Sequence, residues 1–150
     1  MQDANYKMMK TNKQLIGIDL FAGAGGLSLG AEMAGISMRY AVEADAYAAA
    51  SYKRNFKNAT VFCEDIRKLS ADKLNTQPVF IIMGGPPCQG FSLSNTKTRD
   101  MSNPNNRMFE EFLRFVDKIA PTWFVFENVY GLTKFKNGEE NIQNLSLIHI

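Results

Sequence analysis

The residue best suited to covalent chemistry is Cys88, in the run GGPPCQGFS at residues 84–92. Two prolines restrict the backbone before the thiol and glycines flank it, so a loop positions this cysteine. A thiolate held in this way is a candidate nucleophile. The only histidine, His149, lies among the last six residues and is not expected to act as its base, which disfavours a papain-like cysteine hydrolase.

The second cysteine, Cys63, ends an expected strand and is predicted to be an inert thiol in the core. The two cysteines are 25 residues apart with no histidine nearby, so no metal site is predicted. Two cysteines are also too few for a disulfide scaffold, which favours a reducing compartment.

A carboxyl group is expected near Cys88. Glu127 begins the triplet ENV at residues 127–129, directly after an apolar run. If the strands that precede Cys88 and Glu127 are neighbours, the carboxyl group lies beside the thiol. Glu127 is therefore a candidate general acid, although it could instead be a solvated or helix-capping residue.

A glycine-rich loop, DLFAGAGG at residues 19–26, joins an expected strand to an expected helix. Its glycines allow a tight turn and let backbone N–H groups approach a ligand near the helix N-terminus. Ser28 stands where the dinucleotide fingerprint has its third glycine. Glu43 and Asp65 end the next two strands, where an acidic side chain can bind ribose hydroxyls. We expect a nucleoside-containing cofactor; the alternative is a tight turn followed by helix caps.

Short apolar runs alternate with helix-length segments, a pattern typical of βαβ units and a parallel sheet. The expected strands are residues 15–21, 38–42, 60–63, 79–83 and 123–126. The expected helices are residues 27–34, 46–55, 70–74 and 108–119.

Three further signals bound these elements: Gly35 as a helix stop, Asp45 as a helix N-cap and Pro121 as the end of the last helix. In the first helix, the expected apolar positions are Leu27, Leu29, Ala31, Met33 and Ala34.

The predicted fold is an α/β Rossmann-like domain with sheet order 3-2-1-4-5. Its carboxyl edge should carry Gly23, Glu43, Asp65, Cys88 and Glu127.

Composition excludes several classes of protein. The chain has 150 residues, of which 45% are hydrophobic and 21% charged, so it is expected to be neither disordered nor a membrane protein. Its net charge of +2 neither indicates nor excludes a nucleic-acid partner. Residues 1–14 carry three lysines and no apolar run, so we expect a polar extension, no signal peptide and a cytoplasmic protein. Residues 145–150, LSLIHI, resemble one translation of a transposon-end sequencing adapter, and we expect a non-native tail there.

Taken together, the motifs resemble the cytosine-C5 DNA methyltransferases that use S-adenosylmethionine. The resemblance covers about residues 15–131, and its most specific parts are PPCQGFS at 86–92 and ENV at 127–129. It implies an S-adenosylmethionine-dependent methyltransferase fold, with residues 15–144 forming part of the catalytic domain. The later strands and the target-recognition domain are expected to be absent.

The resemblance also implies residue roles. Cys88 would be the nucleophile and Glu127 the partner of the cytosine ring nitrogen. Cofactor contacts are implied for Phe21, Ala22, Gly23, Gly25, Gly26, Glu43, Asp65, Ile66, Pro87 and Met108. Substrate contacts are implied for Gln89, Gly90, Ser92, Asn128 and Val129. One departure is Ala44, where some members of the family have an aromatic residue that stacks on adenine.

The implied reaction is methylation of cytosine C5 through a covalent bond between Cys88 and C6 of a flipped base. Double-stranded DNA is then the partner, and the protein is expected to be a monomer that contacts no membrane. A cognate restriction endonuclease is a candidate further partner, and the sequence leaves open whether the parent enzyme is paired with one or solitary. The 150-residue chain by itself is expected to be inactive.

Three alternatives stay open. A tRNA cytosine-C5 methyltransferase uses the same Cys and Glu chemistry on RNA. An NAD-dependent Rossmann oxidoreductase explains the glycine loop and Glu43 but gives Cys88 no purpose. A non-catalytic nucleic-acid-binding module is the third, and the presence of residues for every chemical step argues against it.

Overall fold

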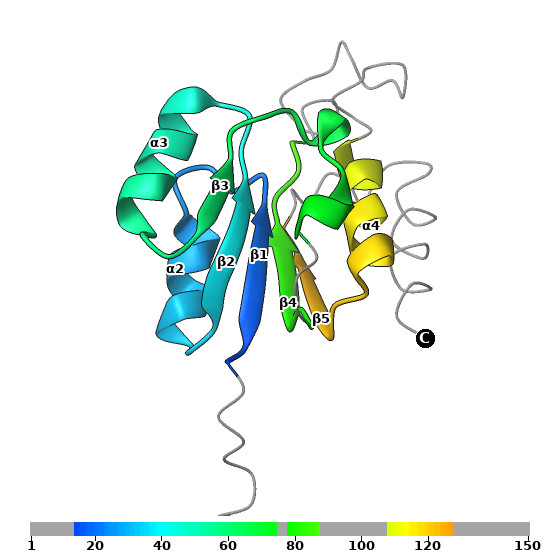
Figure 1. The fold of residues 1–150 in the computed structure, drawn as a ribbon, viewed down its shortest axis with the longest axis horizontal. Helices are drawn as coiled ribbons and strands as arrows, with labels where there is room; N and C mark the ends of the chain where they lie inside the picture. Colours follow the sequence, from blue (N-terminus) through cyan, green and yellow to red (C-terminus); the bar gives the residue numbers. More distant parts are fainter. Residues whose placement is uncertain (1–13, 75–77, 88–107, 128–150) are drawn as a thin grey trace, which may run out of the picture.

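The computed structural model describes residues 14–74, 78–87 and 108–127. They form a single parallel sheet in the order β3-β2-β1-β4-β5 (Figure 1), which confirms the predicted topology. The strands are β1 (Ile16–Leu20), β2 (Ser37–Val42), β3 (Thr60–Phe62), β4 (Ile81–Gly84) and β5 (Trp123–Phe126). The helices are α2 (Gly26–Met33), α3 (Ala46–Asn55) and α4 (Met108–Ile119), with two 3-10 turns, η1 (Ile66–Lys68) and η2 (Ala71–Leu74).

Helices cover both faces of this sheet. In Figure 1, α2 and α3 lie on one face, and α4 lies on the other with η2 against it. The largest core cluster is on the α4 face, where Ile18, Leu20 and Ile82 pack against Phe112 and Phe115. Because alternate residues of a strand point to opposite faces, Asp19 of β1 points to the α2 face.

Two helix boundaries lie where the sequence signals predicted them. Asp45 accepts hydrogen bonds from the N–H groups of Tyr47 and Ala48, which caps α3. Gly35 has φ of 85°, the left-handed conformation that commonly follows a helix. β1 is shorter than expected because Phe21 leaves the extended region at φ of 59°.

Two other segments differ from the expected bounds. β4 starts and ends later than residues 79–83, and it is buried on both faces as predicted. The expected helix at residues 70–74 is η2, preceded by the unexpected turn η1.

The prediction for Cys63 was wrong. β3 is an edge strand whose pairing with β2 ends at Phe62, so Cys63 lies beyond the ladder and is exposed.

Of the apolar positions expected for α2, only Ala31 is buried. Ser28 and Ala31 are its buried residues, whereas Leu27, Leu29 and Met33 are exposed and Ala34 lies just past the helix end. Packing of Ser28 against Asp19 decides the rotation of this helix.

β5 pairs only with β4 in the described sheet, and its outward side chains are uncovered there. Trp123 is 61% exposed and Val125 43%. Within the described residues, no helix is long and apolar enough to cross a membrane. The same residues hold no cluster of three or more metal-ligating side chains.

Candidate active site

A cavity of about 370 Å³ opens at the carboxyl edge of the sheet, large enough for part of a nucleoside-sized ligand. Its lining is Phe21, Val42, Glu43, Ala44, Glu64, Asp65, Ile66, Arg67, Gly85, Pro87 and Met108. Six residues predicted to contact a cofactor are thus brought together from five separate segments: Phe21, Glu43, Asp65, Ile66, Pro87 and Met108. Of the other four, Ala22, Gly23 and Gly25 lie in the adjoining loop, and Gly26 is the first residue of α2.

Glu43 joins the end of β2 to the glycine loop. Its Oε2 accepts a hydrogen bond from the Gly23 N–H at 2.7 Å, and its Oε1 accepts one from the Asp45 N–H at 2.7 Å. A carboxylate has about four acceptor positions, so each oxygen keeps capacity for a ligand hydroxyl. Glu43 therefore shapes the loop and still faces the cavity.

Gly25 is required both by its backbone and by its neighbours. Its φ is 98°, and a Cβ there would stand 2.2 Å from Cε2 of Phe56. Phe21 also has a positive φ, which is uncommon for a residue with a side chain and concentrates at functional sites. This loop is held in a conformation that few sequences adopt.

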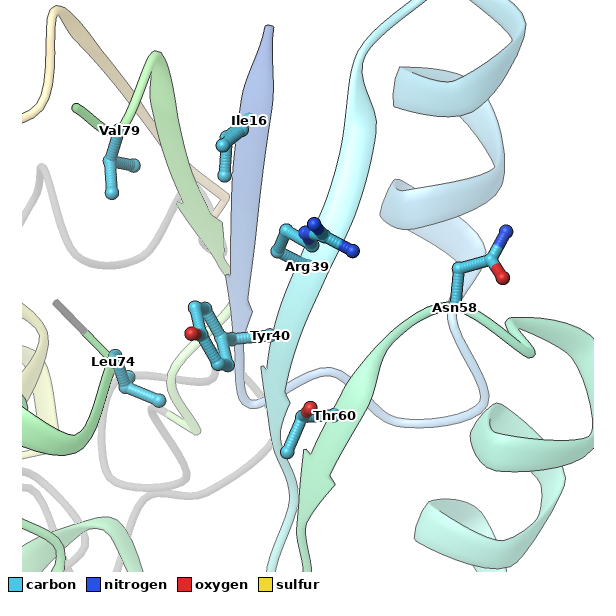
Figure 2. A pocket seen from close by; sticks show the side chains of 7 residues that line it. All are labelled: Ile16, Arg39, Tyr40, Asn58, Thr60, Leu74 and Val79. Atoms are coloured by element: carbon cyan, nitrogen blue, oxygen red, sulfur yellow. The ribbon is translucent and has the colours of Figure 1, made fainter. Parts of the chain in front are cut away.

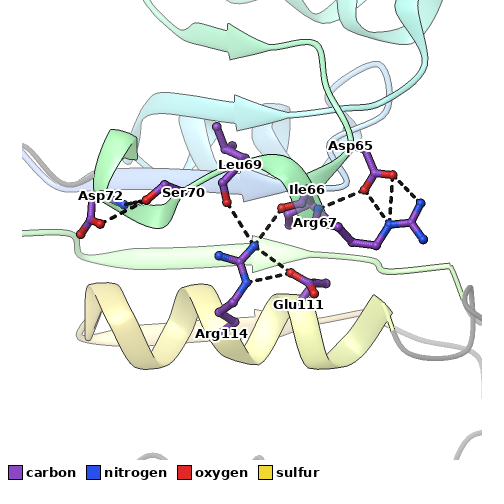
Figure 3. A network of polar contacts seen from close by, with 8 residues as sticks. All are labelled: Asp65, Ile66, Arg67, Leu69, Ser70, Asp72, Glu111 and Arg114. Carbon is purple, nitrogen blue, oxygen red and sulfur yellow. Dashed lines mark hydrogen bonds and ion pairs between the residues drawn. The ribbon is translucent and has the colours of Figure 1, made fainter.

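Asp65 is engaged within its own segment. Figure 3 shows its carboxylate facing the Arg67 guanidinium, with Nε 2.9 Å from Oδ1 and 3.0 Å from Oδ2. Oδ1 also accepts from the Arg67 N–H and so caps η1. The Arg67 hydrogen bonds lower the pKa of Asp65 to about 2. The residue is a helix cap, as the alternative reading had it, and it also lines the cavity.

A buried polar chain lies beneath the glycine loop. Ser28 Oγ donates to Asp19 Oδ2 at 2.6 Å and lies 2.7 Å from the Tyr52 hydroxyl. Burial raises the pKa of Asp19 to about 6, and its Oδ1 has no partner. No motif predicted this hydrogen-bonded network; its signal in the sequence is a lone carboxylate, Asp19, inside an otherwise apolar strand.

Glu127 lies where the ends of β4 and β5 meet. Its N–H donates to Gly84 O at 2.9 Å, and a Cβ on Gly85 would stand 2.6 Å from Glu127 Oε2. The carboxyl group is therefore beside the first residues of the GGPPCQGFS segment. Cys88, Gln89, Gly90, Ser92, Asn128 and Val129 lie outside the described residues.

Three further lining residues follow from no motif: Val42 and Glu64, which lie at or just after strand ends, and Arg67, which lies in η1. A second, smaller cavity of about 170 Å³ lies near the amino ends of the strands (Figure 2). Its lining includes Ile16, Arg39 and Thr60 and none of the predicted site residues.

Residues 15–147 match the family model for C-5 cytosine-specific DNA methylases. The chain belongs to this family. Two curated bacterial methylases illustrate the similarity. The type II methyltransferase M.DdeI of Desulfomicrobium norvegicum is 46% identical over 121 residues, which are 79% of this chain and 29% of that protein. M.XorII of Xanthomonas oryzae pv. oryzae is 42% identical over 128 residues, which are 81% of this chain and 30% of that protein.

A solved methylase structure is also similar. It is a prophage-encoded E. coli protein assigned as a DNA modification methyltransferase, with a TM-score of 0.73 and 38% identity, covering 88% of this chain and 37% of that one. This methylase chain thus spans about a third of the length of the relatives it matches.

The residues of the cavity fit an S-adenosylmethionine cofactor, which methyltransferases generally use. Glu43 offers acceptor positions for ligand hydroxyls, and Phe21, Ile66 and Met108 supply apolar surface.

Proposed function

We propose that this methylase transfers a methyl group from S-adenosylmethionine to C5 of cytosine in DNA. The observation that carries the proposal is the single cavity in which the glycine-loop residue Phe21, Glu43 and Asp65 meet Pro87. Pro87 directly precedes Cys88 in the sequence, so the proposed nucleophile is the next residue after one that lines the cavity.

Each cofactor contact has a physical basis. Glu43 accepts hydrogen bonds from the ribose hydroxyls with its remaining acceptor positions, and Asp65 accepts one from the adenine amino group. Phe21, Ile66 and Met108 pack against the adenine, and Gly23, Gly25 and Gly26 border the methionine part. The cofactor supplies an electrophilic sulfonium methyl group.

The thiolate of Cys88 solves a problem of reactivity, because cytosine C5 is a weak nucleophile. Attack at C6 forms an S–C6 bond and makes C5 enamine-like, while Glu127 at N3 stabilises the charge that develops. C5 would then take the methyl group from the sulfonium sulfur, which keeps the electron pair of the broken S–CH3 bond and leaves as a neutral thioether. The C5 proton leaves to a base, and the S–C6 bond breaks to restore the thiolate and the aromatic ring.

This chemistry requires the cytosine to leave the duplex. We therefore propose double-stranded DNA as the partner, with the target base flipped into the space beside Glu127 and contacted by Gln89, Gly90, Ser92, Asn128 and Val129. We also propose that the methylase is a monomer and that a cognate restriction endonuclease is its partner in a restriction–modification system.

Residues 15–144 are proposed to form part of the catalytic domain. Because this chain spans about a third of its relatives, we propose that turnover requires sequence beyond it and that the isolated chain is inactive. Methyl transfer to mixed-sequence DNA, assayed with the 150-residue chain, tests this. The source nucleotide sequence tests whether residues 145–150 are a non-native tail.

The decisive experiment uses protein from the complete open reading frame and DNA that carries 5-fluorocytosine. Fluorine cannot leave as the C5 proton does, so wild-type protein should remain covalently attached to the DNA. The Cys88→Ser variant should lose methylation and trapping yet keep cofactor binding, because a serine hydroxyl stays protonated at neutral pH. Cys63→Ser, at the exposed cysteine, is the matched control and should behave as wild type.

Mass spectrometry of the adduct identifies the attached residue. Attachment at Cys63, or methylation of DNA without any adduct, would contradict the role of Cys88. Methylation of tRNA but not of DNA would establish the RNA alternative instead, and NAD binding without methyl transfer would favour an oxidoreductase.

A further inference from the structure

We propose that Arg114 is a positioning residue that sets the separation of two walls of the cofactor cavity. The inference rests on the proposed function, because it concerns how the same cavity is held open to the adenosine part of its ligand. Arg114 does not line the cavity and acts through residues that do.

Arg114 ties α4 to the turn that carries Asp65 and Ile66. Its Nη2 donates to the backbone carbonyl of Ile66 at 2.8 Å and to that of Leu69 at 3.1 Å (Figure 3). These bonds span 48 and 45 residues of sequence, so they are tertiary contacts rather than local ones.

The same helix supplies the facing wall. Met108, the first residue of α4, lines the cavity, and so do Asp65 and Ile66 on the turn that Arg114 holds. A shift of η1 relative to α4 would therefore change the cavity directly. Among the described residues, Arg114 is the side chain on α4 that donates hydrogen bonds to the carbonyls of Ile66 and Leu69.

The guanidinium itself is held on two further sides. Its Nε donates to Glu111 Oε2 at 2.8 Å, one turn earlier on α4, and its Cζ lies 4.6 Å from the centre of the Phe115 ring. A planar group with several fixed donors can satisfy two carbonyls and a carboxylate at once, whereas a lysine ammonium lacks that fork geometry. The arrangement thus calls for arginine and not simply for a positive charge.

The next turn of α4 offers a matched control. Lys118 Nζ lies 3.2 Å from Asp72 Oδ1 and also joins α4 to the connection between β3 and β4. Asp72 belongs to η2, and neither residue lines the cavity. This pair is an exposed ion pair between side chains, and its loss removes another tie between α4 and the same connection without touching the cavity wall.

The test uses Arg114→Gln, Arg114→Lys and Lys118→Ala in protein from the complete open reading frame. Affinity for S-adenosylhomocysteine is measured by calorimetry, and kcat and KM for the cofactor are measured on DNA. We expect Arg114→Gln to weaken binding and raise KM about tenfold while kcat at saturating cofactor changes less than about twofold. Arg114→Lys should rescue part of the loss, and Lys118→Ala should bind as wild type.

Equal binding by wild type and Arg114→Gln, or an equal loss in Lys118→Ala, would overturn the inference while leaving the proposed function intact. Failure of the wild-type protein to bind S-adenosylhomocysteine would instead refute the proposed function. If Arg114→Gln does not fold, Arg114→Lys carries the same test: an unchanged KM in a folded Arg114→Lys protein contradicts the requirement for a guanidinium.

Discussion

The Glu127 carboxylate lies so close to Gly85 that a Cβ on this glycine would stand 2.6 Å from Glu127 Oε2. β4 and β5 bring the two residues together, since Gly84 pairs with Phe126 at the ends of these strands. The Glu127 carboxylate can occupy this position because residue 85 has no side chain.

Gly85→Ala should therefore move the Glu127 carboxylate and slow methylation. The obstructing atom is the end of an exposed, flexible side chain, so we expect stability to change by less than about 1 kcal/mol. Cofactor affinity and kcat are both measured on the full-length Gly85→Ala methylase. We expect kcat to fall while the cofactor affinity changes little. Unaltered kcat in this variant would mean that Glu127 does not act from the place it occupies here.

Glu43→Ala should weaken cofactor binding by about 1.5–3 kcal/mol, the range for a hydrogen bond to a charged group. Glu43→Gln should rescue little, because both carboxylate oxygens accept backbone N–H groups and an amide NH2 cannot accept one. Calorimetric titration with S-adenosylhomocysteine measures both variants, with the exposed Glu32→Gln on α2 as control. Full affinity in Glu43→Gln would show that the loop bonds at Glu43 are dispensable.

Asp19 should make folding less favourable as pH rises. Burial raises its pKa from 3.8 to about 6, so between these values the unfolded chain ionises while the folded chain must stay protonated. The contribution of Asp19 to the stability of the folded chain is thus most favourable below pH 4 and falls between pH 4 and 6. Above pH 6 it is less favourable by on the order of 3 kcal/mol.

Urea denaturation at several pH values tests this prediction. The stability of Asp19→Asn relative to wild type should grow between pH 4 and 6, whereas Asp117→Asn, on the exposed side of α4, should run parallel to wild type. A pH-independent difference for Asp19→Asn would show that Asp19 stays ionised in the folded chain.

Gly25→Ala should destabilise the domain by on the order of 2–3 kcal/mol, because it combines a left-handed backbone with a clash against Phe56. Gly30→Ala is the contrast: Gly30 lies inside α2, a Cβ there would meet no atom within 4 Å beyond the backbone of its own helix, and the substitution should stabilise the domain by about 0.5–1 kcal/mol. Urea midpoints of the two variants decide, and similar midpoints would rule out a special conformation at Gly25.

The sequence by itself determined the order of strands and the edge that carries the chemistry. Apolar runs of strand length alternate with helical segments, and parallel strands with right-handed crossovers leave few topologies. Glu43, Asp65 and Glu127 could be assigned to one edge for that reason. Local signals, such as the Asp45 cap and the Gly35 stop, depend on neighbours a few residues away and were predicted correctly.

Tertiary structure alone decided which faces are buried and how the side chains at that edge are paired. α2 buries Ser28 and leaves the more apolar Leu27 and Leu29 exposed, because the Ser28 hydroxyl bonds to Asp19 on the facing strand. Cys63 is exposed because the β2–β3 ladder ends one residue earlier. Arg114 reaches carbonyls 45 and 48 residues away, and no periodicity within α4 encodes partners on another segment. Patterns along a chain specify local geometry, whereas these contacts exist only once distant segments are packed together.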